Sequence, residues 1–338
     1  MSRHPFVPAL ALAVVFAAAA AAAQPAWDFY ACAIVNRNYT IGNRVATANG
    51  VYQRLDDGTW AHRGYSDPTI TAVAFDPRDP RVVYTSALNG LWRSLDGGRH
   101  WRIANDWDMT EARDVVVDPN APDHVYLALP DGIAVSTDRG QTIVRREAGL
   151  PLRGKYTQVL QVDRTRAGRV LAGCEAGIFL TEDGARRWRR VFAARDTVYD
   201  VQQSPHDPRH WLAATHRAGL VQSHDAGLTW AAAAAAPAAH PLYNVTFDLT
   251  QPERIALGGW SVGVFTSEDG GRTWVARNAG LPAPPTVWRV GVDPAGRLYA
   301  SVHGETLFVS ADFGRTWQPD TLAGAQVNKF VLVPRRGP

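Results

Sequence analysis

Cysteine, methionine and lysine are scarce in this chain of 338 residues, which has two cysteines, two methionines and only Lys155 and Lys329 as lysines. Two cysteines cannot form the disulfide framework of a small secreted domain, and Cys32 and Cys174 lie far apart in the sequence. We therefore expect two buried, unpaired thiols. Arginine supplies almost all of the positive charge, and a formal net charge of +3 is too small and too scattered to predict nucleic-acid binding.

Long hydrophobic runs are absent after the first residues. No later stretch approaches the roughly 20 apolar residues that span a bilayer, so we expect no transmembrane segment. The N-terminal stretch MSRHPFVPALALAVVFAAAAAAAQPAW combines Arg3, an apolar run and an Ala-x-Ala site before Gln24, with no cysteine for a lipid anchor. This pattern is typical of a signal peptide. We expect residues 1–23 to be removed and residues 24–338 to be secreted or periplasmic.

The short motifs of common catalytic and cofactor sites are also missing. The sequence has no Gly-x-Ser-x-Gly, phosphate-binding loop or dinucleotide fingerprint. His206 and His210 have the i, i+4 spacing of helical metal ligands, but Pro205 and Pro208 predict a turn there. The sequence therefore predicts neither a metal nor a cofactor.

One motif, Ser/Thr-x-Asp-x-Gly-x-x-Trp, is repeated along the chain. It reads SLDGGRHW at 94, SHDAGLTW at 223, SEDGGRTW at 267 and SADFGRTW at 310, with degenerate copies STDRGQTI at 136 and TEDGARRW at 181. Successive copies begin 42, 45, 42, 44 and 43 residues apart. A near-constant period in this range indicates one supersecondary unit per period.

Each period contains four short strands. In the first, ITAVAFDP (70–77), RVVYTSA (81–87), LWRSL (91–95) and HWRIA (100–104) are strand-like segments separated by turn residues. Four strands per period is typical of a propeller blade. Because LDDGTW (55–60) is a shortened seventh copy, we predict an all-β fold with a single seven-bladed propeller of four-stranded antiparallel blades. AQVNKFVLVP (325–334) adds a strand, so the N- and C-terminal strands should pair to close the ring; which of them is innermost is left open.

The repeated motif predicts structure rather than chemistry, because a catalytic site is normally built once. Its Asp and Ser/Thr side chains can hydrogen-bond the backbone of a turn, and its glycines allow unusual backbone angles. Its tryptophan can bury a large face between blades. We therefore assign a structural role to the motif carboxylates Asp96, Asp138, Asp183, Asp225, Asp269 and Asp312.

With these copies, the chain resembles the BNR or Asp-box repeat propellers over essentially all of its mature length. That family includes sialidases, xyloglucan-active endoglucanases, sortilin-type receptors and photosystem II assembly factors, so the fold does not fix the function. In its plan, an exported ring of seven blades, the chain is most similar to the assembly-factor-like proteins. The resemblance implies that the motif turns lie on one face and that ligands bind the opposite face.

On that opposite face, residues at the start of the inner strands should surround the channel mouth. Counting back from the Asp-Pro-like position of each period gives a first ring of Thr71, Arg113, Gln158, Tyr199, Tyr243, Trp288 and Asn328. The second ring is Ala72, Asp114, Val159, Asp200, Asn244, Arg289 and Lys329. Turns between the second and third strands add Asn89, Asp131, Glu175, His216, Arg217, Trp260, His303 and Glu305. Polar and aromatic residues in the rings predict a lined, water-filled funnel, although any propeller channel needs polar walls.

Basic residues outnumber acids near this channel. They are Arg113, Arg153, Lys155, Arg195, Arg217, Arg289 and Lys329, against Asp114 and Asp200. Arginine suits carboxylate and phosphate groups, and flat aromatic rings suit sugars or protein hot spots. We therefore expect a monomeric, non-catalytic binding or assembly protein whose partner is an acidic protein or polysaccharide. The predicted ligand-binding residues are Arg113, Asp114, Tyr156, Tyr199, Asp200, Tyr243, Trp288, Arg289 and Lys329.

A glycoside hydrolase is the alternative. Such an enzyme needs two carboxyl groups roughly 5–10 Å apart, and the candidates for catalysis are Asp108, Glu175 and Asp200, with Tyr199 as a nucleophile. The Arg-Ile-Pro segment that a sialidase would require is absent from the sequence, and the nearest string is PERIAL at 252–257. The xyloglucan-active relatives resemble two such rings with substrate between them, whereas this sequence predicts one.

Overall fold

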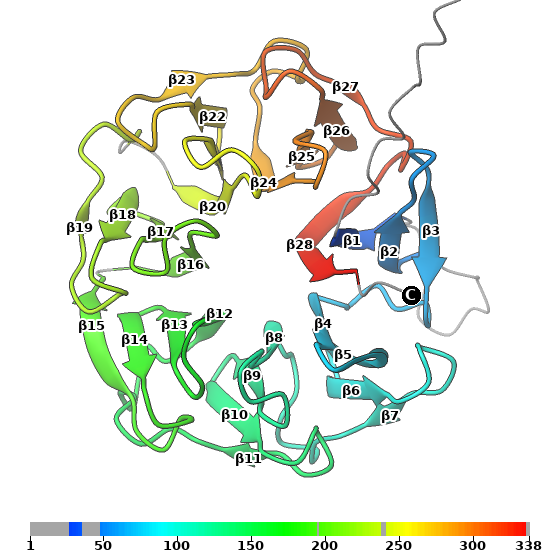
Figure 1. Cartoon of the computed structure of the whole chain (residues 1–338), viewed down its shortest axis with the longest axis vertical. Helices are drawn as coiled ribbons and strands as arrows, with labels where there is room; N and C mark the ends of the chain where they lie inside the picture. The colour runs from blue at the N-terminus through cyan, green and yellow to red at the C-terminus, as the bar shows by residue number, and fades with distance from the viewer. Residues whose placement is uncertain (1–26, 36–47, 195, 238–240, 336–338) are drawn as a thin grey trace, which may run out of the picture.

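The computed structural model describes residues 27–35, 48–194, 196–237 and 241–335, and over these residues it contains strands, turns and loops but no helix. The strands form seven four-stranded antiparallel sheets, arranged as the blades of one propeller ring (Figure 1). The predicted fold class and number of blades are confirmed. None of the described segments is a helix that could cross a membrane. The predicted signal peptide and Arg195 lie outside the described residues.

Each blade runs from an inner strand at the channel to an outer strand at the rim, and we number the blades 1 to 7 from the one that contains β1. The inner strands of blades 1 to 7 are β28 (Gln326–Pro334), β4 (Ala72–Asp76), β8 (Asp114–Val117), β12 (Thr157–Val162), β16 (Val198–Gln203), β20 (Leu242–Phe247) and β24 (Val287–Val292). The second strands are β1 (Trp27–Ile34), β5 (Asp79–Ala87), β9 (Val125–Leu129), β13 (Val170–Cys174), β17 (Trp211–Thr215), β21 (Ile255–Gly259) and β25 (Leu298–Val302). The third strands are β2 (Gly50–Arg54), β6 (Gly90–Ser94), β10 (Gly132–Ser136), β14 (Gly177–Thr181), β18 (Leu220–Ser223), β22 (Gly263–Ser267) and β26 (Leu307–Ser310). The outer strands are β3 (Trp60–Arg63), β7 (Arg102–Ile103), β11 (Val144–Arg145), β15 (Arg189–Ala193), β19 (Ala231–Ala232), β23 (Val275–Ala276) and β27 (Gln318–Pro319).

The hydrophobic core lies between neighbouring blades. Every residue of β9, β13, β17, β21 and β25 is buried, because a second strand is covered on both faces by adjacent blades. One core cluster joins Tyr84 of blade 2 to Leu127 of blade 3. Outer strands such as β7 are exposed and short. The burial of both faces explains why the second strands are continuous apolar runs in the sequence.

Blade 1 closes the ring with strands from both ends of the chain. Its strand order is β28-β1-β2-β3, so the C-terminal strand is innermost and lies between β24 and β4 (Figure 1). β1 and β28 pair from Trp27↔Pro334 to Ile34↔Gln326, and the rings of Phe29 and Phe330 stack with their centroids 5.2 Å apart. The predicted pairing of the two ends is confirmed, and the order of the strands is now defined.

The repeated motif forms tight turns between the third and outer strands, which we call the acidic turns. In blade 6 the Ser267 hydroxyl donates to Asp269 Oδ1 (2.8 Å) and accepts a hydrogen bond from the Gly271 amide (2.8 Å). The Asp269 carboxylate accepts hydrogen bonds from the hydroxyl and amide of Thr273, and these bonds lower the pKa of Asp269 to about 2. The first Ser or Thr of all six motif copies is buried. The hydroxyl is therefore the buried anchor of the turn, a role that the sequence analysis divided between the hydroxyl and the carboxylate.

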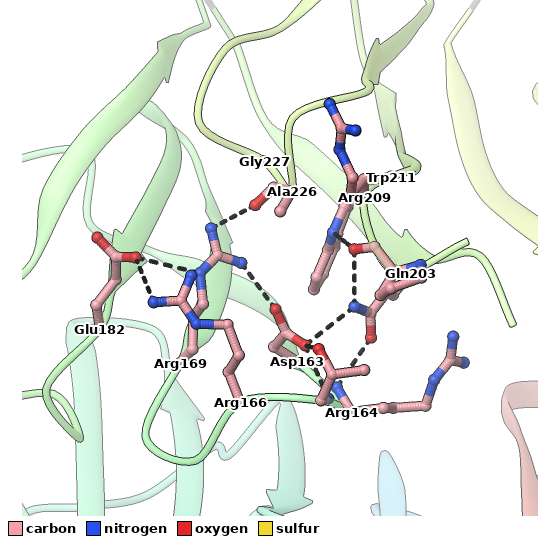
Figure 2. Close-up of polar contacts among 12 residues, drawn as sticks. Asp163, Arg164, Arg166, Arg169, Glu182, Gln203, Arg209, Trp211, Ala226 and Gly227 are labelled. Carbon is pink, nitrogen blue, oxygen red and sulfur yellow. Dashed lines mark hydrogen bonds and ion pairs between the residues drawn. The ribbon is translucent and has the colours of Figure 1, made fainter. Parts of the chain in front are cut away.

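Blades 4 and 5 are joined, on the face that carries the acidic turns, by a buried arginine (Figure 2). Arg169 and Asp163 form an ion pair of 3.0 Å, and each side chain is 1% exposed. Arg169 also donates to the carbonyl of Ala226 in the acidic turn of blade 5, and Asp163 accepts a hydrogen bond from Gln203 Nε2 (3.1 Å). A buried ion pair is tolerated when its remaining polar atoms find partners. Glu182 and Thr165 of blade 4 supply some of these partners, and Ala226 and Gln203 of blade 5 supply the others, so the pair connects the two blades.

Cys32 and Cys174 are both buried and unpaired, as predicted. Burial raises the pKa of each thiol to about 12. Neither side chain therefore carries a reactive thiolate at neutral pH.

Candidate functional site

A cavity of about 330 Å³ lies at the channel mouth on the face opposite the acidic turns. All seven inner strands begin at this end of the channel, so their first residues converge there. The lining includes the complete first ring: Thr71, Arg113, Gln158, Tyr199, Tyr243, Trp288 and Asn328. The structure therefore brings together every residue that the repeat register placed in this ring.

A β-bulge in each blade turns the first-ring residue towards the cavity. In blades 4 to 7 and in blade 1, the pairing register skips one residue, which is Gln158, Tyr199, Tyr243, Trp288 and Asn328 respectively. In blade 2, Ala72 pairs with Ser86, and the amide of Thr71 donates to the carbonyl of the same Ser86. In blade 3, Asp114 pairs with Ala128, and the amide of Arg113 donates to the carbonyl of the same Ala128. A bulge breaks the strand's alternation and re-aims a side chain. One such bulge in each of the seven blades directs a first-ring side chain towards the cavity.

The second ring ties neighbouring blades together beneath the cavity. Asp114, Asp200 and Asn244 are 2%, 4% and 7% exposed. Each accepts a hydrogen bond from a backbone amide of the next blade: Leu160 (3.0 Å), Val245 (3.1 Å) and Val290 (2.5 Å). Asp114 and Asp200, predicted to bind ligand, are therefore engaged with the protein backbone and do not line the cavity.

Arg289 and Lys329, also in the second ring, have partners within the protein. Arg289 lines the cavity but donates to the carbonyl oxygens of Asn328 (2.7 Å) and Tyr243 (2.8 Å). Burial lowers the pKa of the Arg289 guanidinium, and the second-ring carboxylates oppose that shift. Lys329 forms an ion pair with Asp114. Both side chains therefore stabilise the channel wall.

Blades 5 to 7 form an aromatic half of the cavity. The ring centroids of Tyr199 and Tyr243 are 4.9 Å apart, and those of Tyr243 and Trp288 are 4.6 Å apart. The Tyr199 hydroxyl lies 3.0 Å from Nδ1 of His216. Burial raises the pKa of Tyr199 and of Tyr243. A tyrosine nucleophile needs the opposite shift, so this environment does not favour Tyr199 as a catalytic residue.

Blades 1 to 4 and the loops beside them form the polar half of the cavity, in which the polar residues outnumber Ile34, Pro68, Leu88 and Ala112. Arg113 lies over the ring of Tyr156, with its guanidinium carbon 5.8 Å from the centroid. Among the described residues, the guanidinium of Arg113 and the side-chain amide of Gln158 have no hydrogen-bond or ion-pair partner. Glu111 is the one acidic residue among those described as lining the cavity. The polar half therefore presents unpaired groups to anything that enters.

The predicted catalytic residues do not gather in this cavity. Asp108 is exposed and pairs with Arg145 (3.4 Å), and Glu175 is exposed. Of Asp108, Glu175, Asp200 and Tyr199, only Tyr199 lines the cavity. In the part of the chain that the structure describes, no three His, Cys, Asp or Glu side chains are placed to hold a metal ion.

Three further rings, predicted only to lie at turns of this face, border the site. They are His216, Trp260 and His303, which follow the first-ring residues of their blades by 17, 17 and 15 residues. Their centroids lie 5.9 Å from Tyr199, 6.1 Å from Tyr243 and 6.4 Å from Trp288 respectively. The recurring aromatic spacing in three consecutive periods is the signal that could have identified them.

Comparison with known proteins supports the fold. No family model matches the chain, so the predicted membership of the Asp-box repeat family remains a prediction. The oligoxyloglucan-reducing end-specific xyloglucanase of Emericella nidulans is 22% identical over 240 residues, which cover 65% of this chain and 24% of the relative. The chain thus spans about a quarter of that protein.

Two solved structures show the same architecture. The GH74 xyloglucanase of Xanthomonas campestris matches with a TM-score of 0.63 and 18% identity, over 82% of this chain and 50% of that one. YCF48 bound to D1 peptide matches with a TM-score of 0.58 and 17% identity, over 76% of this chain and 83% of that one. At these identities the likeness establishes a propeller and no activity.

Proposed function

We propose that this protein is a non-catalytic binding or assembly protein that acts outside the cytoplasm and holds an acidic group of a protein or glycan in the cavity. One observation carries the proposal: a bulge in every blade directs side chains into a single cavity, where Arg113 has an unpaired guanidinium. Arginine binds carboxylate through two parallel hydrogen bonds, which gives this group a natural ligand. The remaining cation of the lining, Arg289, is already hydrogen-bonded to the backbone.

The solved neighbours are consistent with binding. YCF48 has been solved with a D1 peptide bound, and this chain covers most of that protein's length. The absence of catalysis is supported by the acids of the wall: among the described lining residues only Glu111 is acidic, whereas hydrolysis of a glycoside requires a pair. A partner with an acidic group therefore fits better than a glycoside undergoing hydrolysis.

A glycoside hydrolase is the second candidate because the curated relative is a xyloglucanase. This chain covers half of the solved xyloglucanase of Xanthomonas campestris. Incubation with chromogenic glycosides and xyloglucan oligosaccharides distinguishes the two functions. Turnover abolished by Asp108→Asn or Glu175→Gln would establish the enzyme and overturn the proposal of a binding protein.

The acidic-group proposal is tested by two arginine variants. Binding of poly-glutamate peptide and of oligouronate to the full chain is measured by titration. Arg113→Ala should weaken binding of the recognised probe about tenfold or more, as expected for loss of a charge-assisted hydrogen bond. Arg272→Ala, on an acidic turn with a side chain 78% exposed, is the matched control and should change nothing. Equal effects of the two variants, or no effect of the first, would contradict the proposal.

A further inference from the structure

Three consecutive blades contribute aromatic rings at the same two positions. The first position is the bulge of the inner strand and the second is the turn between the second and third strands. The pairs are Tyr199 and His216 in blade 5, Tyr243 and Trp260 in blade 6, and Trp288 and His303 in blade 7. This pattern occurs only in blades 5 to 7 among the described residues, and most lining residues from blades 1 to 4 are polar. The cavity therefore has an aromatic side and a polar side.

Five of the six rings form two connected arcs, an inner arc of three rings and an outer arc of Trp260 and His303, and His216 contacts only Tyr199 of the inner arc. The inner arc of Tyr199, Tyr243 and Trp288 lines the cavity. In the outer arc, the rings of Trp260 and His303 lie 6.0 Å apart, and Trp260 is 42% exposed. Contacts between Tyr243 and Trp260 (6.1 Å) and between Trp288 and His303 (6.4 Å) join the arcs. An aromatic surface therefore continues from the cavity onto the turns between the second and third strands of blades 6 and 7.

Opposite the arcs lie polar groups with no partner among the described residues. They are the guanidinium of Arg113, the amide of Gln158 and the carboxylate of Glu111. Asn328 uses its Nδ2 atom to donate to the carbonyl of Ile70 (3.0 Å), and its Oδ1 atom is unpaired. Glu111 is exposed, so water can satisfy its carboxylate, but Arg113, Gln158 and Asn328 are half-buried, and polar groups away from water are normally hydrogen-bonded. A ligand with many hydroxyl groups could form hydrogen bonds with these free donors and acceptors.

We propose that the cavity binds the end of a saccharide chain that carries a carboxylate, a hexuronate, with its ring against the inner arc and its carboxylate on Arg113. The proposal rests on the proposed function and names its ligand class. A pyranose ring has an apolar C–H face, which matches the aromatic half, and a hydroxyl-bearing edge, which matches the polar half. The cavity of about 330 Å³ is at the small end of ligand pockets and suits one or two sugar units better than a folded peptide segment.

The outer arc extends the site. The sugar unit next to the one in the cavity would lie over Trp260 and His303, whose rings continue the same aromatic surface onto the turns of blades 6 and 7. Trp107, 90% exposed on the loop before β8, lies outside both arcs. These two tryptophans therefore provide a matched pair of variants, neither of which removes a buried side chain.

The experiment compares trigalacturonate with its carboxyl-reduced counterpart and with an acidic peptide, using calorimetric titration of the full chain. Trigalacturonate should bind about tenfold or more tightly than the reduced trisaccharide, and Arg113→Ala should remove that difference. Trp260→Ala should weaken binding of both saccharides about fivefold, whereas Trp107→Ala should not.

The outcomes separate the two proposals. Binding of the acidic peptide alone, in a manner sensitive to Arg113, would overturn the saccharide and leave the proposed function standing. Equal binding of the charged and reduced saccharides would overturn the role of the carboxylate. If neither acidic probe binds, or if binding ignores Arg113 and Trp260 alike, both proposals fail.

Discussion

Lys329, on the innermost strand of blade 1, forms an ion pair with Asp114 of blade 3 across the blade between them. The matching ring position of blade 2 is Ala72, whose side chain is a single methyl group. Asp114 also accepts hydrogen bonds from the amides of Val115 (2.9 Å) and Leu160 (3.0 Å). One carboxylate thus links the closing strand to two other blades.

Replacing Lys329 with methionine should destabilise the ring. The change leaves the carboxylate of Asp114, which is 2% exposed, without its counter-ion, and we expect a loss of about 1–3 kcal/mol in the free energy of unfolding. Lys155→Met is the control, since its partner Glu147 is 25% exposed and keeps its ion pair with Arg145, so we expect a loss of about 0–1 kcal/mol. Chemical denaturation of both variants measures the difference. Equal losses would show that the Asp114 pair has no special role.

The buried hydroxyl of an acidic turn should matter more than its carboxylate. Ser136 is 1% exposed and accepts a hydrogen bond from the Gly140 amide (2.7 Å), which is also buried. Ser136→Ala leaves that amide without a partner and should cost about 1–3 kcal/mol. Asp138→Ala removes the acceptor of the Gln141 and Thr142 amides, but water can reach both, so the loss in the free energy of unfolding should be smaller. Thermal unfolding of the two variants compares their losses of stability. A larger loss for Asp138→Ala would show that the carboxylate, and not the hydroxyl, is the main stabilising group of the turn.

The acidic turns should also make stability depend on pH. Burial of Asp138 alone would raise its pKa, but hydrogen bonds from Thr142 outweigh that effect, and the net result is a pKa of about 2; hydrogen bonds likewise lower the pKa of Asp269 and Asp312 to about 2. Because these values lie below about 3.9, the value for an unfolded chain, the ionised turns stabilise the fold above about pH 4 and lose that contribution as the pH falls towards 2. A triple Asp→Asn variant at these positions should have a lower melting temperature than the wild type at pH 7. The difference should shrink at pH 2, and a constant difference would argue against the linkage.

The two cysteines should report unfolding. Burial raises the pKa of Cys32 and of Cys174 to about 12, so the native protein should not react with a thiol reagent at pH 8. Both thiols should become reactive at the denaturant concentration that unfolds the propeller. Fast labelling of either cysteine in the native state would mean that its blade opens locally.

The fold could be predicted from the sequence because one motif recurs with a nearly constant period. The same register placed Arg113, Tyr243 and Trp288 in a common ring, and the structure places them around one cavity. What the period cannot reveal is how a side chain points. Alternation along a regular strand would direct Tyr199 and Val201 to the same side, yet Tyr199 lines the cavity and Val201 is buried in the core, because the bulge takes Tyr199 out of the regular register.

The sequence could not predict which strand of blade 1 is innermost, for a different reason. β1 and β28 are both apolar at alternate positions, and either could have packed against the channel. The polar residues Asn328 and Lys329 on β28 reach partners in other blades, whereas β1 carries Ala31 and Cys32 at buried positions. Satisfying those polar groups is the physical reason that β28 is innermost.

The position of β28 has a consequence for how the protein is made. Asn328 belongs to β28, the last strand among the described residues, and is part of the cavity wall. During synthesis the six blades that follow β1 can form in order, but the wall stays incomplete until β28 leaves the ribosome and docks beside β1. A chain that stops short of β28 would have every acidic turn and both aromatic arcs and still lack a closed pocket. Binding of the proposed ligand therefore requires β28, and retention on a ligand column would sort chains that contain this strand from chains truncated before it.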